Sequence, residues 1–424
     1  MKKLPLLFAA FLVVSASGLR AGEPSDIHTL LRRLDGLLDR REEFLLRHEA
    51  RLDSLKSLLR GDTLGFGARY AVTAEIAERY FAYQSDSTIA YLRRNVALAE
   101  RAGNADLTIR AKSVMAMCYS MNGRFLEADR VLAGVTDTLH MSRATQAAYY
   151  AAQHRQNREC RSQSEPGAER DRFRACEEYY ARRALETTGD ISKRFYFAYL
   201  VAVDEGDYDR AAAACDSALA CAPPVSHDYA RAAFYRSETE RFRGDEAARF
   251  EWLVRAAMAD VQGAVRDYGA LGGVAEELLR RGDAARAMRC IRVAINDTQA
   301  YNSPIRSWRD MAILPQIEQA YSERNARLRA MYVALILLAF LFALSAIGGV
   351  LFVLRQNRRL NAVQQTLRES NGKLAELAAS LRETNADLSR QNIRIADANR
   401  IKEVYIGGFL KTISEYIYKL AHTY

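Results

Sequence analysis

Residues 282–287 read GDAARA and residues 206–211 read GDYDRA, and these two strings carry the pattern that decides the fold. In both, a Gly-Asp turn signal is followed by alanine five residues after the glycine. Related turn signals begin at Ser85, Gly123 and Gly244. The small residues after the five turns are Ala90, Ala128, Ala248 (one place early), Ala211 and Ala287. Glycine suits a tight turn and alanine allows two helices to approach closely, so the pattern predicts stacked helical hairpins.

The turn signals are regularly spaced along the chain. The intervals are 38, 83, 38 and 38 residues, and 83 is close to two periods. The long interval contains RQNRECRSQSEPGAERDRFRAC at residues 155–176, which we interpret as a polar loop inside a sixth, expanded unit. Because the period exceeds the roughly 34 residues of a tetratricopeptide repeat, we expect a tetratricopeptide-like solenoid over residues 63–322.

The segment before the repeats has a helical stripe of leucines and other apolar residues. Over residues 26–60 this stripe predicts one long helix, within an N-terminal region at 19–62. The chain has only 7 prolines in 424 residues, and it is rich in Ala, Leu and Arg, as expected for an all-α protein.

An uncharged apolar run, MYVALILLAFLFALSAIGGVLFVL, occupies residues 331–354 and has arginines on both sides. As a helix it measures roughly 36 Å, which is enough to cross a hydrocarbon core of about 30 Å. The sequence therefore predicts a single transmembrane helix.

The N-terminus has the features of a secretory signal. Lys2 and Lys3 precede an apolar stretch at residues 4–14, and small residues follow up to Gly18. We expect a signal peptide at residues 1–18, with an uncleaved anchor as the alternative. Basic residues slightly favour the C-terminal side of the span as cytoplasmic. This predicts a single-pass inner-membrane protein with a periplasmic N-terminal domain and a cytoplasmic C-terminus.

The formal net charge is +9, but most arginines lie before the span, where we interpret them as solvated helix faces rather than nucleic-acid contacts. All six cysteines also lie there. Cys160 and Cys176 form the best candidate disulfide, and Cys215 with Cys221 is the second. Cys118 and Cys290 have apolar contexts typical of small core residues. The six histidines are expected at the surface or at helix ends.

An apolar heptad follows the span. Its members are Leu360, Leu367, Leu374, Leu381, Leu388 and Ile395. With these at d, the a positions are Gln364, Asn371, Ala378, Asn385, Asn392 and Asn399. Leucine at d with asparagine at a predicts a parallel homodimeric coiled coil over residues 355–403, whose buried asparagines fix register but lower stability. A single surface helix is the alternative. Residues 404–424 form an amphipathic tail.

Motifs for catalysis or cofactor binding are missing from the sequence. It contains no Walker-type phosphate loop, no G-x-S-x-G, no H-E-x-x-H and no C-x-x-C, and its histidines lack the spacing of metal ligands. We therefore expect a protein that is not an enzyme and needs no cofactor or metal.

Several long strings resemble one bacterial family. They are HEARLDSLKSLLR (48–60), YQSDSTIAYLRRNVALAERAGN (83–104), DVQGAVRDYGALGGVAEELLRRGDAARAMRCIRVAINDTQAYNSPIRSW (260–308), ILPQIEQAY (313–321) and IKEVYIGGFLKTISEYIYKL (401–420). The chain resembles tetratricopeptide-containing membrane proteins of Gram-negative bacteria, classed under a domain of unknown function. The resemblance implies a membrane-bound transcriptional regulator with an exported repeat domain. Relatives continue into a DNA-binding element, whereas this sequence ends soon after residue 420, so DNA binding is not carried over.

These observations favour a signalling or regulatory membrane protein. Its repeat domain would bind a protein or peptide, with the concave face of hairpins 2–5 as the candidate region, and would signal through the span to the coil. The alternative is a membrane-tethered scaffold that transmits no signal.

Overall fold

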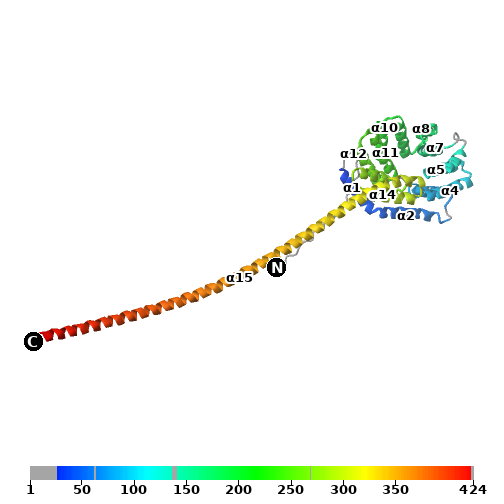
Figure 1. Ribbon diagram of the computed structural model, residues 1–424. Helices are drawn as coiled ribbons and strands as arrows, with labels where there is room; N and C mark the ends of the chain where they lie inside the picture. Colours follow the sequence, from blue (N-terminus) through cyan, green and yellow to red (C-terminus); the bar gives the residue numbers. More distant parts are fainter. Residues whose placement is uncertain (1–25, 62–63, 136–140, 268, 422–424) are drawn as a thin grey trace, which may run out of the picture. The chain divides into compact units, whose positions relative to one another are not determined.

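The computed structural model describes residues 26–61, 64–135, 141–267 and 269–421, with only the backbone for 304–309. All regular elements in these residues are α-helices (Figure 1). Two helices come first, α1 (Ile27–Asp39) and α2 (Arg41–Leu58). Six hairpins follow: α3 (Phe66–Phe81) with α4 (Ser85–Arg101), α5 (Ala105–Met121) with α6 (Phe125–Ala133), α7 (Arg143–Gln163) with α8 (Ala168–Thr187), α9 (Ile191–Asp204) with α10 (Tyr208–Cys221), α11 (His227–Arg243) with α12 (Glu246–Gln262), and α13 (Leu271–Arg280) with α14 (Ala284–Tyr301). The last helix is α15 (Pro304–Ala421). The expected all-α, tetratricopeptide-like solenoid is confirmed.

The Gly-Asp pairs have two separate roles in the turns. Gly206 and Gly282 adopt φ of 72° and 82°, the left-handed conformation that ends a helix with little strain in glycine. The aspartate that follows caps the next helix: Asp207 accepts from the backbone N–H of Arg210 at 2.9 Å, and Asp283 does the same from the N–H of Arg286 at 3.2 Å. One dipeptide therefore ends the first helix of a hairpin and starts the second.

The alanines after the turns are buried in three of the five cases. Ala128, Ala211 and Ala287 are each 0 % exposed, as helix–helix contact requires. Ala248 is only half-buried, and the prediction for Ala90 is wrong because this residue is exposed. The first turn lies two residues earlier than its sequence signal, since α3 already ends at Phe81. Thr88, which is 0 % exposed, occupies the contact position instead.

The sixth unit is present as α7 and α8, but it is not expanded by a loop. Only residues 164–167 between these helices are non-helical, so interpreting 155–176 as a polar loop was wrong. The polar residues lie on helix faces and form ion pairs, such as Arg161 with Glu177 at 2.5 Å across the hairpin. Such ion pairs add to a core in which Tyr149 and Tyr150 of α7 pack near Ala181 and Ala184 of α8.

Residues 26–60 form two helices, and the prediction of one long helix was wrong. The chain bends at Arg40, which has φ −99° and ψ 9°. Leu34 of α1 is buried in the core that contains α12 and α14, whereas Leu52 of α2 packs beside Ile76 of α3 in a different cluster. A straight helix could not place both leucines in their cores, and this explains the bend.

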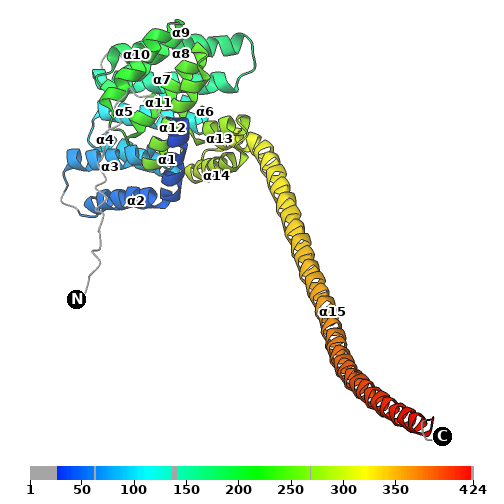
Figure 2. The same ribbon diagram turned by 90° about the vertical axis from the view of Figure 1, so that its left-hand side faces the viewer.

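The last hairpin contacts the first one. Arg266 and Asp267, which follow α12, donate their backbone N–H groups to the carbonyl oxygen of Ala82 at 2.6 and 3.1 Å. Ser85 Oγ donates to the carbonyl oxygen of Asn302, just after α14, at 3.1 Å. The six hairpins, which follow one another in Figures 1 and 2, therefore close on themselves. Their sequence period does not predict this closure.

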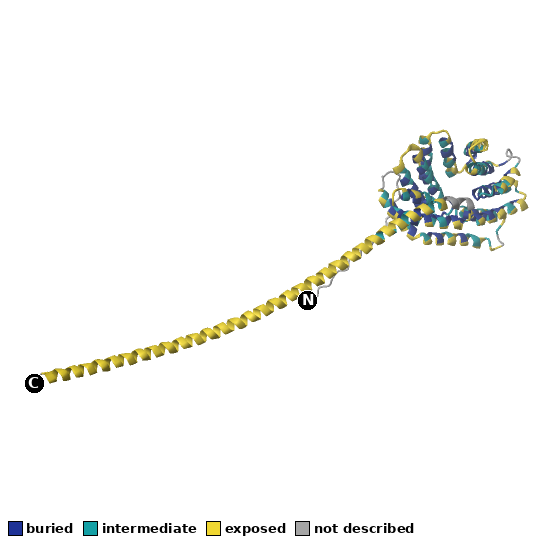
Figure 3. Ribbon diagram, viewed as in Figure 1, coloured by how far each residue is buried: buried dark blue, intermediate teal, exposed yellow. Residues whose placement is uncertain are grey.

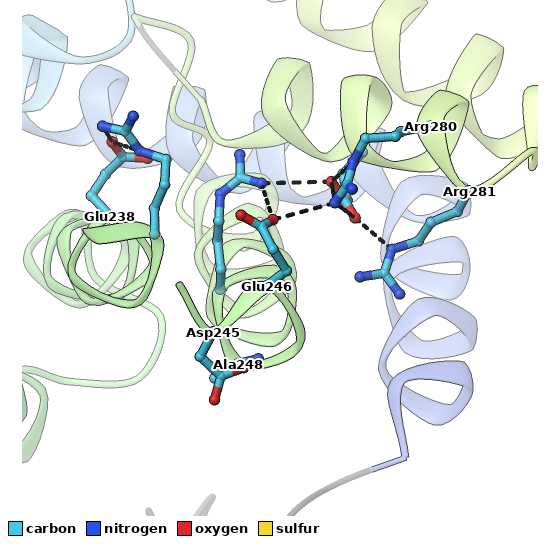
Figure 4. A network of polar contacts seen from close by, with 9 residues as sticks. Glu238, Asp245, Glu246, Ala248, Arg280 and Arg281 are labelled. Atoms are coloured by element: carbon cyan, nitrogen blue, oxygen red, sulfur yellow. Dashed lines mark hydrogen bonds and ion pairs between the residues drawn. The ribbon is translucent and has the colours of Figure 1, made fainter. Parts of the chain in front are cut away.

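A buried carboxylate joins α12 to α13. Glu277 is 3 % exposed and accepts from Arg280 at 2.7 Å and from Arg281 at 2.6 Å. Arg249 lies 3.6 Å from the same carboxylate and 2.8 Å from Glu246 (Figure 4). Burial raises the pKa of Glu277, but the arginines outweigh it and the pKa lies below the usual value.

Residues 327–424 form a second unit, whose described part belongs to α15. Every residue from 331 to 421 is exposed (Figure 3), including the apolar run at 331–354. Among the described residues, α15 is the one helix long and apolar enough to cross a membrane. The predicted signal peptide at 1–18 lies outside the described residues.

Candidate functional site

Five side chains from α7, α9 and α11 form an arginine–tyrosine cluster inside the repeat domain. Its members are Arg155 and Arg158 of α7, Tyr196 of α9, and Arg231 and Tyr235 of α11. These are the first helices of hairpins 3, 4 and 5, the type of helix that lines the concave face of such an array. The cluster therefore falls within the region expected from the sequence.

Aromatic rings and guanidinium groups alternate in the cluster. Arg158 donates to the hydroxyl of Tyr196 at 3.4 Å, and its guanidinium carbon lies 6.0 Å from the ring centroid of Tyr235. The guanidinium of Arg231 lies 5.3 Å from the ring of Tyr196, and the two tyrosine rings are also 5.3 Å apart. These contacts hold the arginines in fixed positions, which is favourable for recognition of a ligand.

The charges in this cluster do not balance. Arg155 pairs with Glu159 at 3.3 Å, and Arg231 pairs with Asp228 at 2.7 Å. Arg158 has no ion pair with any carboxylate in the described part of the chain. Tyr235 and, at longer range, Glu177 and Glu159 raise the pKa of Arg158, so its charge is stabilised without a direct ion pair. A bound anion would supply that direct partner.

The positive charge also affects the tyrosines. Burial raises the pKa of Tyr235, but the charges of Arg158 and Arg155 outweigh burial and lower it. Burial, assisted by Tyr235, raises the pKa of Tyr196 to about 12.

A histidine beneath the cluster adds no charge. His154 is 2 % exposed, so its expected place at the surface was wrong. Among the described residues its Nε2 has no hydrogen-bond partner, although Glu177 Oε1 lies 3.8 Å away. Its ring lies edge-on to that of Phe197, with the centroids 5.6 Å apart. Burial and the neighbouring arginines hold the pKa of His154 well below its usual value, so the imidazole is neutral.

The cysteines are free thiols in the structure. Cys160 on α7 and Cys176 on α8 are both half-buried, and their disulfide stays a prediction. Cys118 and Cys290 are buried as expected, and burial raises the pKa of each thiol to about 12. Within the described ranges, no group of His, Cys, Asp and Glu could hold a metal ion.

The predicted coil residues all lie on α15. Its heptad leucines remain between 50 % and 62 % exposed, namely Leu367, Leu374, Leu381 and Leu388. The predicted register residues Asn371, Asn385, Asn392 and Asn399 are exposed as well. A single chain therefore leaves this stripe without a partner surface.

The arginine–tyrosine cluster was not predicted from the sequence, because its arginines were interpreted as exposed residues on solvated helix faces. A usable signal was present: contacting residues lie about one repeat period apart. Arg158 precedes Tyr196 by 38 residues, and Tyr196 precedes Tyr235 by 39. Residues one period apart on the first helices of successive hairpins occupy equivalent positions and meet.

Comparison with known proteins gives one clear match. The model of the SusR N-terminal tetratricopeptide-repeat domain matches residues 38–311. The search of curated proteins found no match. The matched range begins in α1 and ends in the first turns of α15, so it includes all six hairpins and covers more than half of the chain. The chain therefore belongs to the family that carries the SusR N-terminal tetratricopeptide-repeat domain.

Proposed function

We propose that the protein is a single-pass inner-membrane regulator of the SusR type. Its exported repeat domain binds a protein or peptide, and residues 331–354 cross the membrane. A cytoplasmic coiled coil over residues 355–403 transmits the signal to a partner that regulates transcription. Membership of the SusR family supports the regulatory role, and the apolar run with flanking arginines supports the span.

The arginine–tyrosine cluster is the surface that we assign to the partner. Arg158 makes no direct ion pair with the described residues, so an acidic side chain or a C-terminal carboxylate of the bound segment can form one with it. Tyr196 and Tyr235 provide flat apolar area next to it, as tyrosine commonly does at protein interfaces.

One observation carries the proposed relay. Helix α15 contains both Ile317, which is 0 % exposed in the core of the repeat domain, and the apolar run at 331–354. An unbroken helix transmits rotation or translation along its axis better than a flexible linker does. A partner that shifts the packing around Ile317 would therefore shift the register of a coil formed beyond residue 354.

Cysteine crosslinking in membranes tests the relay. All natural cysteines precede residue 331, and Cys221 is exposed, so all six are first replaced. Single cysteines at Leu374 and Leu381 then report on the coil alone. We expect a crosslinked dimer from both, and much less from the matched control Ser380→Cys, which lies off the a/d seam. A partner that acts through the coil should change the ratio of crosslinking at the two leucine positions.

Other outcomes separate the alternatives. No crosslink at either leucine position, or equal crosslinking at Ser380, would contradict the coil. A strong crosslink that no ligand changes, with function intact after deletion of 360–424, would favour the membrane-tethered scaffold. Replacing Asn385, Asn392 and Asn399 with Ile should lock the coil and abolish any ligand response.

A further inference from the structure

The first and last hairpins meet in a small group of segments that we call the clasp. It consists of residues 82–86 at the turn from α3 to α4, residues 264–267 after α12, and residues 302–303 between α14 and α15. Besides the bonds described above, Asn302 Nδ2 donates to Asp86 Oδ2 at 2.6 Å, and Ser303 Oγ donates to the carbonyl oxygen of Met121 at 3.1 Å. These contacts are polar, and they are made by turns and helix ends rather than by helix faces.

Arg266 contributes the longest side chain of the clasp. Its guanidinium carbon lies 4.0 Å from the ring centroid of Tyr83, whose hydroxyl donates to Glu49 Oε1 of α2 at 2.6 Å. The same ring lies against His48, with 4.5 Å between the centroids. Among the described residues, neither Arg266 Nε nor His48 Nε2 has a hydrogen-bond partner, although both atoms are buried. Such atoms cost free energy, so the closed ring is less stable than its number of contacts implies.

The backbone of the clasp is strained where it belongs to the last hairpins. Ala264 and Asn302 have φ of 55° and 64°, and they are the two non-glycine residues with positive φ in the described part of the chain. Asparagine tolerates the left-handed conformation, whereas alanine is disfavoured there. Strained residues persist only where surrounding contacts hold them, and they concentrate at clamps and switch regions. Both of these residues belong to the clasp.

The two N-terminal helices span the same closure and provide a hinge. Helix α1 packs in the core of the last hairpins, and α2 packs beside α3 (Figure 2). Arg40, between the two helices, belongs to neither. Contacts that cross from one core to the other are few: Phe44 and Ala264 lie in the opposite core, and Arg41 pairs with Asp297. A rotation at Arg40 therefore separates the first hairpin from the last while most of each core stays packed.

The clasp is joined directly to α15. Asn302 and Ser303 are the two residues between the end of α14 at Tyr301 and the start of α15 at Pro304. Ser303 is 2 % exposed, and Ile317, further along α15, is buried in the core of the last hairpins. With no linker between them, a movement of Asn302 also moves the start of α15.

We propose that the clasp is a conformational switch. The ring opens by rotation at Arg40, the clasp contacts break, and the part of α15 around Ile317 loosens from the repeat domain. A partner that binds the open and closed forms with different affinity shifts the balance between them. Opening is a property of the repeat domain alone, and only its effect on a coil rests on the proposed function.

Hydrogen exchange followed by mass spectrometry, on the full-length chain in detergent micelles, tests the switch. Arg266→Ala removes the stack on Tyr83 and should speed exchange in residues 310–326 and in α3 about tenfold, with α9 and α10 unchanged. Arg94→Ala is the matched control, because Arg94 lies over the ring of Tyr91 at 4.8 Å in α4, outside the clasp. This control should leave exchange in 310–326 as it is.

A covalent bridge tests the switch from the opposite direction. Once the six natural cysteines are replaced, Asp86→Cys and Asn302→Cys place thiols where two side chains are in contact, and a short bismaleimide joins them. Bridging should slow exchange in residues 310–326, measured against the same variant before bridging. This comparison decides the question even if Arg266→Ala loosens the whole domain, since a bridge across the clasp holds the ring closed.

Two results would overturn the switch. One is unchanged exchange in residues 310–326 after bridging, and the other is an equal response of these residues to Arg94→Ala and Arg266→Ala. Neither measurement involves the coil. A switch that fails here therefore leaves the crosslinking test of the proposed relay untouched, and a failed crosslink leaves the switch standing.

Discussion

The repeat domain and the part of α15 beyond residue 330 differ in how far their apolar side chains are exposed. In the repeat domain, residues such as Phe250 and Ile291 are buried by other helices of the same chain, at 1 % and 0 % exposure. Beyond residue 330 the large apolar residues are all exposed, among them Phe342 at 77 %. An apolar surface of this extent requires an environment that the single chain does not supply. The first region buries its apolar side chains within its own fold, whereas the second leaves them exposed, as the proposed span and coil require.

The largest effect should come from placing charge in the apolar run. Leu341→Arg combined with Ala343→Arg puts two charges near its centre. Each arginine raises the free energy of membrane insertion by about 3 kcal/mol. We expect the protein to leave the membrane fraction in alkaline carbonate extraction. The matched control, Gln364→Arg with Thr366→Arg beyond the run, should stay in the membrane. Retention of the first variant would show that residues 331–354 are not the anchor.

The next effect separates buried from exposed apolar residues. Ile291→Ala removes a fully buried side chain and should destabilise the repeat domain by about 2–5 kcal/mol. Leu381→Ala, at a residue that is 62 % exposed, should leave the melting of that domain unchanged. Thermal unfolding followed by circular dichroism measures both. Equal destabilisation by the two changes would break the contrast between the regions.

Glu277 gives a smaller effect that depends on pH. Glu277→Gln should destabilise the repeat domain by about 2 kcal/mol at pH 7, since hydrogen bonds of a buried charge are lost. The folded-state pKa is lower than the unfolded one, so this stability is present above the unfolded value of about 4.3 and disappears as pH falls through the folded value. The variant and the parent should therefore converge in acid. A constant difference from pH 7 to pH 3 would exclude the carboxylate as its source.

The smallest effect concerns one strained backbone position. Ala264 adopts φ 55° in the segment after α12, a conformation that disfavours residues with a Cβ atom by about 1–2 kcal/mol. Ala264→Gly should raise stability by up to about 1 kcal/mol after the added freedom of the unfolded chain is subtracted. The same change at Ala90, exposed in the middle of α4, should lower it by about 1 kcal/mol. Chemical denaturation measures the free energy of unfolding of both variants. A change of the same sign in both would contradict backbone strain at Ala264.

Much of the hairpin array was predictable from local chemistry. The Gly-Asp pairs at Gly206 and Gly282 act over a few residues, and the glycines were found in tight turns as expected. The capping role of the aspartates was not predicted, although it is equally local. The turn near Ser85 was misplaced by two residues because no glycine marks it. The helix at 26–60 was predicted as continuous because its leucine stripe is continuous, although the leucines serve two cores.

The candidate site and the packing of distant helices were less predictable. Arg158 and Tyr196 lie one repeat period apart, so the period could have indicated their contact. Gly272 and Asp310 are 38 residues apart in the sequence, and their close approach depends on how α13 and α15 pack.

The sequence alone determined the all-helical class, the repeat period, the apolar run and the heptad, because each is a pattern of residues close together in the chain. Tertiary structure decided the bend at Arg40, where Leu34 and Leu52 pack into different cores, and the contact of the last hairpin with the first. The contact depends on small rotations between successive hairpins, which add up over six units and which no local pattern encodes.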